Sequence, residues 1–336
     1  MSTNKKAMVP WLLLAALVAA AGMALLVQRG TPSDDASDSG PFQYDLSDLR
    51  SAQASENVVC RELSNIETGL QQIDSIDVNG QRLVLVGGDV LTAVDDRGTE
   101  LMRVSLAEPA HTVLAHEDRV LVGFADHVET FAQDGVLQSR WADLGQNAYV
   151  TDLAVTGPHV LVGDAGSKVV WIFDLEGALR GRVGEKDAGR GIPGFLIRSM
   201  ALAVVPDGPA TFWAVNSGRQ SVQRYTIKGD FLEQWGRASM EPDGFCGCCN
   251  PVHLARLPDG WFVTSEKGLV RIKLYRPDGT YAGLVTPVAD YENTSIAPDI
   301  ATDERGKIYV AEPRGGRVRV FTRRSDTADL EQTVNE

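Results

Sequence analysis

Short apolar runs, rather than helical periods, characterise the chain after about residue 56. The runs are rich in β-branched and aromatic residues and are separated by turns containing Gly, Asp or Asn, which is the pattern of β-strands. Another strand follows each run about ten residues later, and a small apolar segment precedes each of the last four runs. The sequence therefore predicts four-stranded repeats of about 36–52 residues, the size of a propeller blade. Six runs align: RLVLVGG (82–88), RVLVGFA (119–125), HVLVGDA (159–165), TFWAVNSG (211–218), GWFVTSEKG (260–268) and KIYVAEPRG (307–315).

Six repeats of this kind predict an all-β, six-bladed β-propeller over residues 56–324. A single four-stranded sheet cannot bury both of its faces, whereas six sheets packed radially can bury one another's. The last repeat ends near Arg324 and lacks one strand. We expect the surplus segment ENVVCREL (56–63) to supply that strand and to close the ring.

Two of the later repeats share a more specific pattern. Residues 250–285 combine a starting proline, an x-x-A segment, a DG turn, a V-x-x strand and an R-I-x-x-Y strand before the next DG. Residues 297–321 follow the same pattern, and 150–177 follow it more loosely. The chain thus resembles the NHL-repeat family of six-bladed propellers, although its first two repeats keep only the strand pattern. The resemblance implies the fold and leaves function open, because such propellers bind protein or RNA and a few are enzymes.

The N-terminal segment has a different character from the repeats. Residues 9–27 comprise 19 residues without charge, which as a helix would span about 28 Å, roughly one hydrocarbon core. Lys5 and Lys6 precede them, so we expect residues 1–8 in the cytoplasm and the propeller exported, on the extracytoplasmic (periplasmic) side. The alternative is a cleaved signal peptide, but the run is long for one. Residues 28–55 are expected to form an acidic flexible linker, and 325–336 a disordered acidic tail.

Charge excludes one class of partner. The 32 Lys and Arg residues face 45 Asp and Glu residues, which gives a net charge of −13. Such an excess repels the phosphates of nucleic acid, so no nucleic-acid partner is expected. A membrane, through residues 9–27, and a protein are the expected partners.

Three long loops that precede inner strands of later blades indicate the working face. These loops are 183–198, 236–251 and 286–298. Repeat proteins commonly carry such insertions on their binding face. The first residues of the six inner strands are predicted to be Ser75, Val113, Asp152, Ala201, His253 and Asp299.

Asp152, His253 and Asp299 are therefore expected to face the channel mouth together. They could form an acid–base or metal cluster, or only a solvated polar rim. Polar residues also recur at the end of the second strands, where short side chains hold turns, and we interpret them as structural. These residues are Asp164, Asn216, Ser265, Glu266 and Glu312.

Three of the four cysteines lie within four positions of the second long loop. Outside the cytoplasm, Cys246 and Cys249 could form a C-x-x-C disulfide. With Cys248 and His253 they could instead hold copper, zinc or an iron–sulfur cluster, or act as redox-active thiols. Cys60, in the ring-closing strand, is expected to be a lone buried thiol.

Three functions follow from these observations. The first is a membrane-tethered extracytoplasmic propeller that acts as a binding or scaffold module through the three-loop face. The second is a metal-binding or thiol redox protein based on the cysteine cluster. The third is an enzyme like the propeller lactonases or lyases, which is less favoured because the chain has only five histidines and only His253 begins an inner strand.

Overall fold

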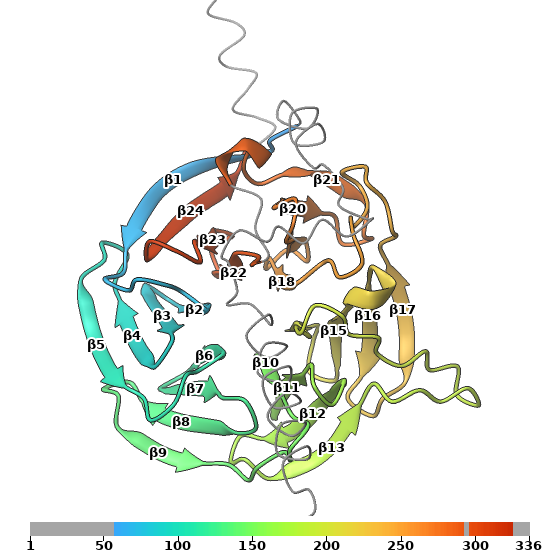
Figure 1. The fold of residues 1–336 in the computed structure, drawn as a ribbon, viewed down its shortest axis with the longest axis horizontal. Coiled ribbons are helices and arrows are strands. Elements are labelled where there is room, and N and C mark those ends of the chain that lie inside the picture. Colours follow the sequence, from blue (N-terminus) through green and yellow to red (C-terminus); the bar gives the residue numbers. More distant parts are fainter. Residues whose placement is uncertain (1–56, 292–295, 325–336) are drawn as a thin grey trace, which may run out of the picture. The chain divides into compact units, whose positions relative to one another are not determined.

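Six four-stranded antiparallel sheets surround a central axis (Figure 1). The structure, a computed structural model, describes residues 57–291 and 296–324. The predicted all-β, six-bladed propeller is confirmed within these residues. The predicted cytoplasmic segment, anchor, linker and tail (1–8, 9–27, 28–55 and 325–336) lie outside them. Within the described part of the chain, no helix is long and apolar enough to cross a membrane.

Blades 1 to 3 follow one another in sequence, each running from the inner to the outer strand. Blade 1 contains β2 (Ser75–Asn79), β3 (Arg82–Gly87), β4 (Val90–Val94) and β5 (Glu100–Ser105). Blade 2 contains β6 (Thr112–His116), β7 (Arg119–Gly123), β8 (Val128–Ala132) and β9 (Leu137–Arg140). Blade 3 contains β10 (Val150–Thr156), β11 (His159–Asp164), β12 (Val169–Asp174) and β13 (Leu179–Val183).

Blades 4 and 5 repeat this order, whereas blade 6 takes its outer strand from the start of the chain. Blade 4 contains β14 (Val204–Pro206), β15 (Thr211–Asn216), the 3-10 turn η1 (Ser217–Arg219), β16 (Ser221–Thr226) and β17 (Phe231–Trp235). Blade 5 contains β18 (His253–Arg256), β19 (Phe262–Ser265), β20 (Ile272–Tyr275) and β21 (Tyr281–Leu284), followed by η2 (Val288–Asp290). Blade 6 contains β22 (Asp299–Thr302), β23 (Ile308–Ala311), β24 (Arg317–Arg323) and β1 (Cys60–Glu67).

The ring closes with the N-terminal strand, as predicted. β1 pairs antiparallel with β24 as the outer strand of blade 6, with Cys60 opposite Arg323 and Glu67 opposite Arg317. The strand begins four residues later than the predicted segment 56–63. Residues 57–59 instead bond to the end of β21, where the N–H of Leu284 donates to the Asn57 carbonyl and that of Val59 donates to the Leu284 carbonyl. The closing segment therefore joins blade 6 and also touches blade 5.

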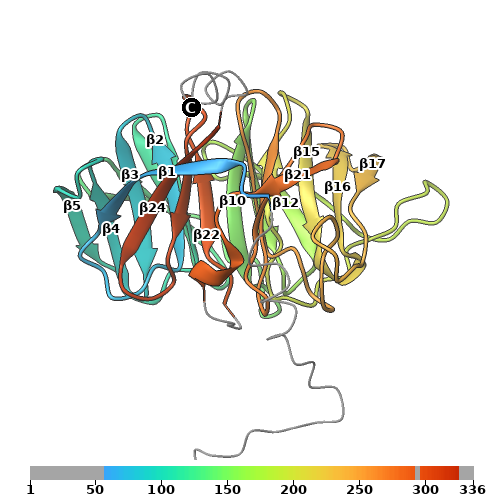
Figure 2. The ribbon, with the colours of Figure 1, turned by 90° about the horizontal axis from the view of Figure 1, so that it is seen from above.

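The hydrophobic core lies between neighbouring blades. One buried apolar cluster fills each of the six junctions between adjacent sheets. Cys60 is buried in the cluster between blades 5 and 6, as expected for an inert thiol. Figure 2 shows the ring from the side, with the loops gathered at its two opposite faces. Because the apolar residues meet between the sheets, polar side chains of the inner strands are left to line the central axis.

Candidate functional site

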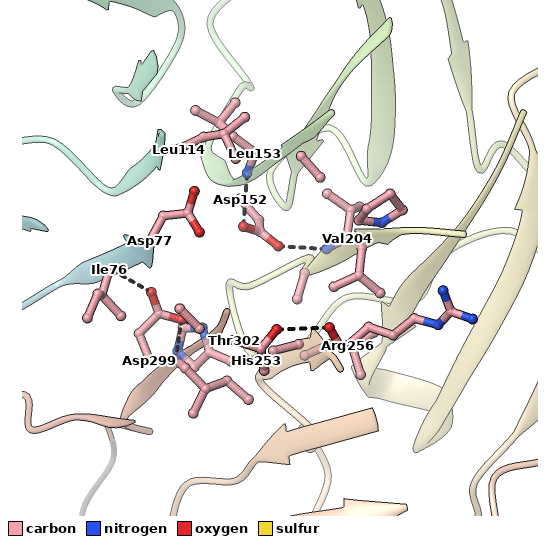
Figure 3. A pocket seen from close by; sticks show the side chains of 18 of the residues that line it. Ile76, Asp77, Leu114, Asp152, Leu153, Val204, His253, Arg256, Asp299 and Thr302 are labelled. Atoms are coloured by element: carbon pink, nitrogen blue, oxygen red, sulfur yellow. Dashed lines mark hydrogen bonds and ion pairs between the residues drawn. The ribbon is translucent and has the colours of Figure 1, made fainter. Parts of the chain in front are cut away.

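The predicted trio Asp152, His253 and Asp299 does line one cavity. This cavity follows the central axis, has a volume of about 400 Å³ and is bordered by all six inner strands or the residues beside them. Figure 3 shows Asp152 on β10 and Asp299 on β22 with their carboxylates toward the central space. Nδ1 of His253, on β18, lies 3.0 Å from a carboxylate oxygen of Asp299.

A third carboxylate, Asp77 on β2, completes the acidic lining (Figure 3). The sequence prediction stopped at Ser75, the first residue of that inner strand. Residues i and i+2 of a strand share one face, so Asp77 must face the channel if Ser75 does. That alternation was the signal that could have identified Asp77.

Each channel carboxylate also joins two blades. The backbone N–H of Ala115 in blade 2 donates to Asp77 at 2.8 Å, and that of Val204 in blade 4 donates to Asp152 at 2.7 Å. The N–H of Ile76 in blade 1 donates to Asp299 at 3.0 Å. The aspartates therefore hold neighbouring inner strands together while their remaining acceptor capacity faces the channel.

Burial shapes the charges of this site. It raises the pKa of Asp77 to about 7 and that of Asp152 to about 8, because a desolvated carboxylate disfavours its negative charge. Burial would also raise the pKa of Asp299, but the His253 ring outweighs it and the net shift is downward. In the same way burial would lower the pKa of His253, and Asp299 more than reverses this. His253 and Asp299 thus form an ion pair, whereas Asp77 and Asp152 have no cationic partner at hydrogen-bonding distance among the described residues.

A second hollow of about 520 Å³ forms the mouth of the channel on the face of the long loops. His253 lines both cavities, so the two meet at this residue. Met200 and Ile296 border the mouth and are about half exposed, at 55% and 48%. The rings of His111 and Tyr149 are in contact nearby, with centroids 4.4 Å apart and planes tilted by 36°. The acidic channel is therefore reached through a partly apolar opening.

The polar residues at the ends of the second strands hold the loops before their blades, as interpreted from the sequence. Asp164 accepts the N–H of Tyr149, and Asn216 accepts that of Leu196. Glu266 accepts the N–H of Cys246. Glu312 and Ser265 are exceptions: Glu312 pairs with Arg317 within its own blade, and the Ser265 hydroxyl has no hydrogen-bond partner among the described residues. These residues fix the loop face in place.

The cysteine loop rests on buried charges that the sequence did not reveal. Arg271 and Lys273 contact the Glu266 carboxylate at 2.8 and 2.6 Å, and all three side chains are fully buried. Both cations also donate to the carbonyl of Gly244. Burial lowers the pKa of Lys273 to about 8, since Glu266 offsets desolvation only in part. Loop 236–251 is thereby fixed to blade 5.

The structure does not assemble the predicted cysteine site. All four cysteines are free thiols; Cys246 is buried, Cys249 half-buried and Cys248 exposed. Burial raises the pKa of both Cys246 and Cys249, which disfavours the thiolate that redox chemistry or metal binding requires. The disulfide, the metal site (Cys246, Cys248, Cys249, His253) and the redox pair stay predictions.

The geometry limits what the channel can bind. Among the described residues, the one group of three His, Cys, Asp or Glu ligand atoms within 4.8 Å of one another is Asp126, His127 and Asp143, in blade 2. The channel carboxylates and the cysteine loop do not form such a group. Nδ1 of His253 is held by Asp299, and the pKa of the ring is raised because this carboxylate outweighs the effect of burial. In its protonated form the ring has no lone pair with which to act as a general base.

Comparison with known proteins supports the fold. No protein-family model and no curated protein matches the chain, so membership of the NHL family is not confirmed. A streptogramin B lyase is similar in structure at 10% identity and a TM-score of 0.54, over 78% of this chain and 97% of that one. A virginiamycin B lyase from Staphylococcus aureus is similar at 13% identity and a TM-score of 0.55, over 78% of this chain and 98% of that one. A protein of unknown function from Bacteroides thetaiotaomicron is similar at 15% identity and a TM-score of 0.53, over 80% of this chain and 74% of that one. At these identities the likeness shows the fold alone.

Proposed function

We propose that this protein is a membrane-tethered, extracytoplasmic binding module that receives a cationic group of a protein partner in its acidic channel. One observation carries the proposal. Asp77 and Asp152 point into the channel without a cation at hydrogen-bonding distance among the described residues, and burial disfavours their ionised forms. A lysine or arginine side chain entering from the loop face would supply the missing positive charge.

The shape of the mouth is consistent with a protein partner. Met200 and Ile296 offer exposed apolar surface beside the channel, and apolar contact commonly surrounds a buried charged anchor at interfaces. The channel oxygens are too widely spaced to ligate one metal ion, since they form no group within 4.8 Å among the described residues. A flexible organic cation that hydrogen-bonds one or two of them fits better. A lyase activity is less well supported, because His253 is held in an ion pair with Asp299.

Selection from a random peptide library on the immobilised full chain tests the proposal without assuming a partner. Peptides rich in lysine or arginine should be enriched, and acetylation of their lysines should abolish binding. Affinity should rise between about pH 6 and pH 9, because Asp77 and Asp152 must lose their protons to pair with the cation.

Matched variants separate the channel from the rest of the surface. Asp152→Asn should weaken binding at least tenfold, and Met200→Ser should weaken it less. Leu137→Ser is the control, because Leu137 is equally exposed (52%) but lies on the outer strand β9. Enrichment of acidic or neutral peptides, or equal binding by Asp152→Asn, would refute the proposal.

A further inference from the structure

The oxygens of the channel carboxylates are already partly occupied by backbone N–H groups. Oδ1 of Asp152 accepts the N–H of Leu153 at 2.9 Å, and Oδ2 accepts that of Val204 at 2.7 Å. Oδ2 of Asp77 accepts the N–H of Ala115 at 2.8 Å. A carboxylate oxygen offers about two lone pairs, so each oxygen of Asp152 keeps room for one further donor. The acceptors left to a ligand are therefore single lone pairs on separate oxygens.

A guanidinium and an ammonium make different demands on such acceptors. A guanidinium is planar, carries five N–H donors and binds a carboxylate best through two parallel bonds, one to each oxygen. An ammonium carries three donors that rotate together, and it can donate to single lone pairs on different carboxylates. Every donor that enters the channel and finds no acceptor costs free energy. The partly occupied oxygens of Asp152 thus suit an ammonium better than a guanidinium.

Arg256, a guanidinium of the chain itself that borders the channel, has what such a group requires. It pairs with a carboxylate oxygen of Asp207 at 2.9 Å, and it lies over the Phe262 ring, 5.8 Å from the centroid. Among the described residues that border the channel cavity, none is Phe, Tyr or Trp. An arginine that entered beside Asp77 and Asp152 would therefore lack the aromatic face on which guanidinium groups commonly stack.

We propose that the channel selects a lysine ammonium over an arginine guanidinium, with Asp77 and Asp152 as its acceptors, an inference that rests on the proposed function. The aliphatic side chains of Leu114, Leu153 and Val204 border the same cavity (Figure 3). They suit the four methylenes of lysine, which pack on apolar surface while the ammonium reaches polar groups. The partner is thereby defined further, as a protein that presents a lysine side chain to the loop face.

Four capped peptides that differ at one residue test this selectivity. They are fluorescently labelled forms of acetyl-Gly-Leu-X-Leu-Gly-amide in which X is lysine, arginine, trimethyl-lysine or acetyl-lysine. Fluorescence anisotropy with the full chain in detergent gives each dissociation constant. At pH 9 most of the Asp77 and Asp152 carboxyl groups are ionised, and lysine and arginine both keep their charge.

The expected order of affinity follows from the donors of each side chain. The lysine peptide should bind at least tenfold more tightly than the arginine peptide. Trimethyl-lysine keeps the charge but has no N–H donor, so it should also bind at least tenfold more weakly than lysine. Acetyl-lysine, which has lost the charge, should not bind.

Variants of the full chain locate the bound ammonium. Asp77→Asn and Asp152→Asn should each weaken binding of the lysine peptide at least tenfold, while asparagine keeps an acceptor for the backbone N–H groups that hold the blades. Asp74→Asn removes a carboxylate of the channel mouth and should have less effect. Glu176→Gln, in an exposed turn of blade 3, removes the same charge elsewhere and should change nothing.

The outcomes separate this inference from the proposed function. Equal or tighter binding of the arginine peptide, with loss in Asp152→Asn, would overturn the selectivity but leave a cation-binding channel in place. Trimethyl-lysine that binds as tightly as lysine would overturn it too, because charge alone would then suffice. Loss of lysine binding in Asp74→Asn but not in Asp77→Asn or Asp152→Asn would place the ammonium in the mouth and contradict the inference. Absence of binding by all four peptides would refute the proposed function, and this inference with it.

Discussion

Replacing Asp152 by asparagine should stabilise the propeller at alkaline pH and have little effect in acid. The folded protein holds a proton on Asp152 up to about pH 8, whereas an unfolded chain releases it near pH 4. Between these values the folded state binds more protons than the unfolded state, so the free energy of unfolding falls as pH rises and levels off above pH 8. Asparagine cannot ionise, so the free energy of unfolding of the variant does not fall with pH for this reason.

The magnitude follows from the size of the pKa shift. A shift of about four units, at 1.36 kcal/mol each, gives an upper bound of about 5 kcal/mol for the cost of ionising Asp152 in the folded state. The carboxylate faces the channel and keeps some contact with water, so we expect about 2 kcal/mol. Asparagine keeps one carbonyl acceptor for the Val204 N–H, as the protonated carboxyl group does, which makes the two forms comparable in acid.

Urea unfolding at pH 5, 7 and 9, followed by tryptophan fluorescence, measures the difference. The gap between Asp152→Asn and the unmodified protein should widen from pH 5 to pH 9 at unchanged m values. Asp299→Asn is the contrasting variant. The pKa of Asp299 is lowered by its ion pair with His253, so its ionised form stabilises the fold and that contribution is lost only as pH falls through the folded-state pKa. The reasoning would be refuted if the difference in the free energy of unfolding between Asp152→Asn and the unmodified protein stayed the same from pH 5 to pH 9.

Three further predictions concern the ring and its loops. Deleting β1 (Cys60–Glu67) should leave β24 as an exposed edge, so the protein should aggregate on gel filtration and lose its cooperative calorimetric transition; a normal transition would contradict closure by this strand. Glu266→Gln should lower the free energy of unfolding by about 3–5 kcal/mol, because two buried cations lose their counter-charge. Lys273→Met should lower it by less, and equal losses in the two variants would contradict a stabilising role of the Glu266 charge. A thiol reagent should label Cys248 before Cys246 in the native protein; simultaneous labelling would mean that the loop opens.

The second strands were predictable because their environment is the same in every blade. Each predicted run, such as 82–88 or 159–165, became a buried second strand, here β3 and β11. The inner strand of blade 4 was less predictable. The apolar segment 200–204 becomes regular only at Val204, because the N–H of Leu202 bonds to the Thr151 hydroxyl of blade 3 rather than to β15. Contacts between blades, which periodicity does not reveal, decide such boundaries.

The candidate sites also differ in whether the sequence alone could reveal them. Asp152, His253 and Asp299 could be found because they occupy one repeated position, and repetition brings repeated positions together around the axis. The ionisable side chains that meet around His127 in blade 2 have no such signal. Glu108, Asp126 and Asp143 come from segments before β6, between β7 and β8, and after β9, so only the folded sheet brings them together. The ion pairs of Glu266 could not be predicted for a different reason. In the sequence, Arg271 and Lys273 resemble ordinary exposed charges of a strand.

In the proposed function, the channel aspartates serve both the stability of the fold and the binding of the partner. Asp77, Asp152 and Asp299 hold neighbouring inner strands through backbone N–H groups, a task that a neutral serine or asparagine could perform with less cost. Ser75 does so, since it accepts the N–H of Val113 at the same junction as Asp77. A buried carboxyl group at such positions is destabilising at neutral pH, because it must either ionise without solvent or hold a proton that the unfolded chain releases, unless a cation accompanies it, as His253 accompanies Asp299. The proposed function accounts for a costly carboxyl group where a neutral substitute exists, because a cationic partner would recover on docking the free energy that folding lost.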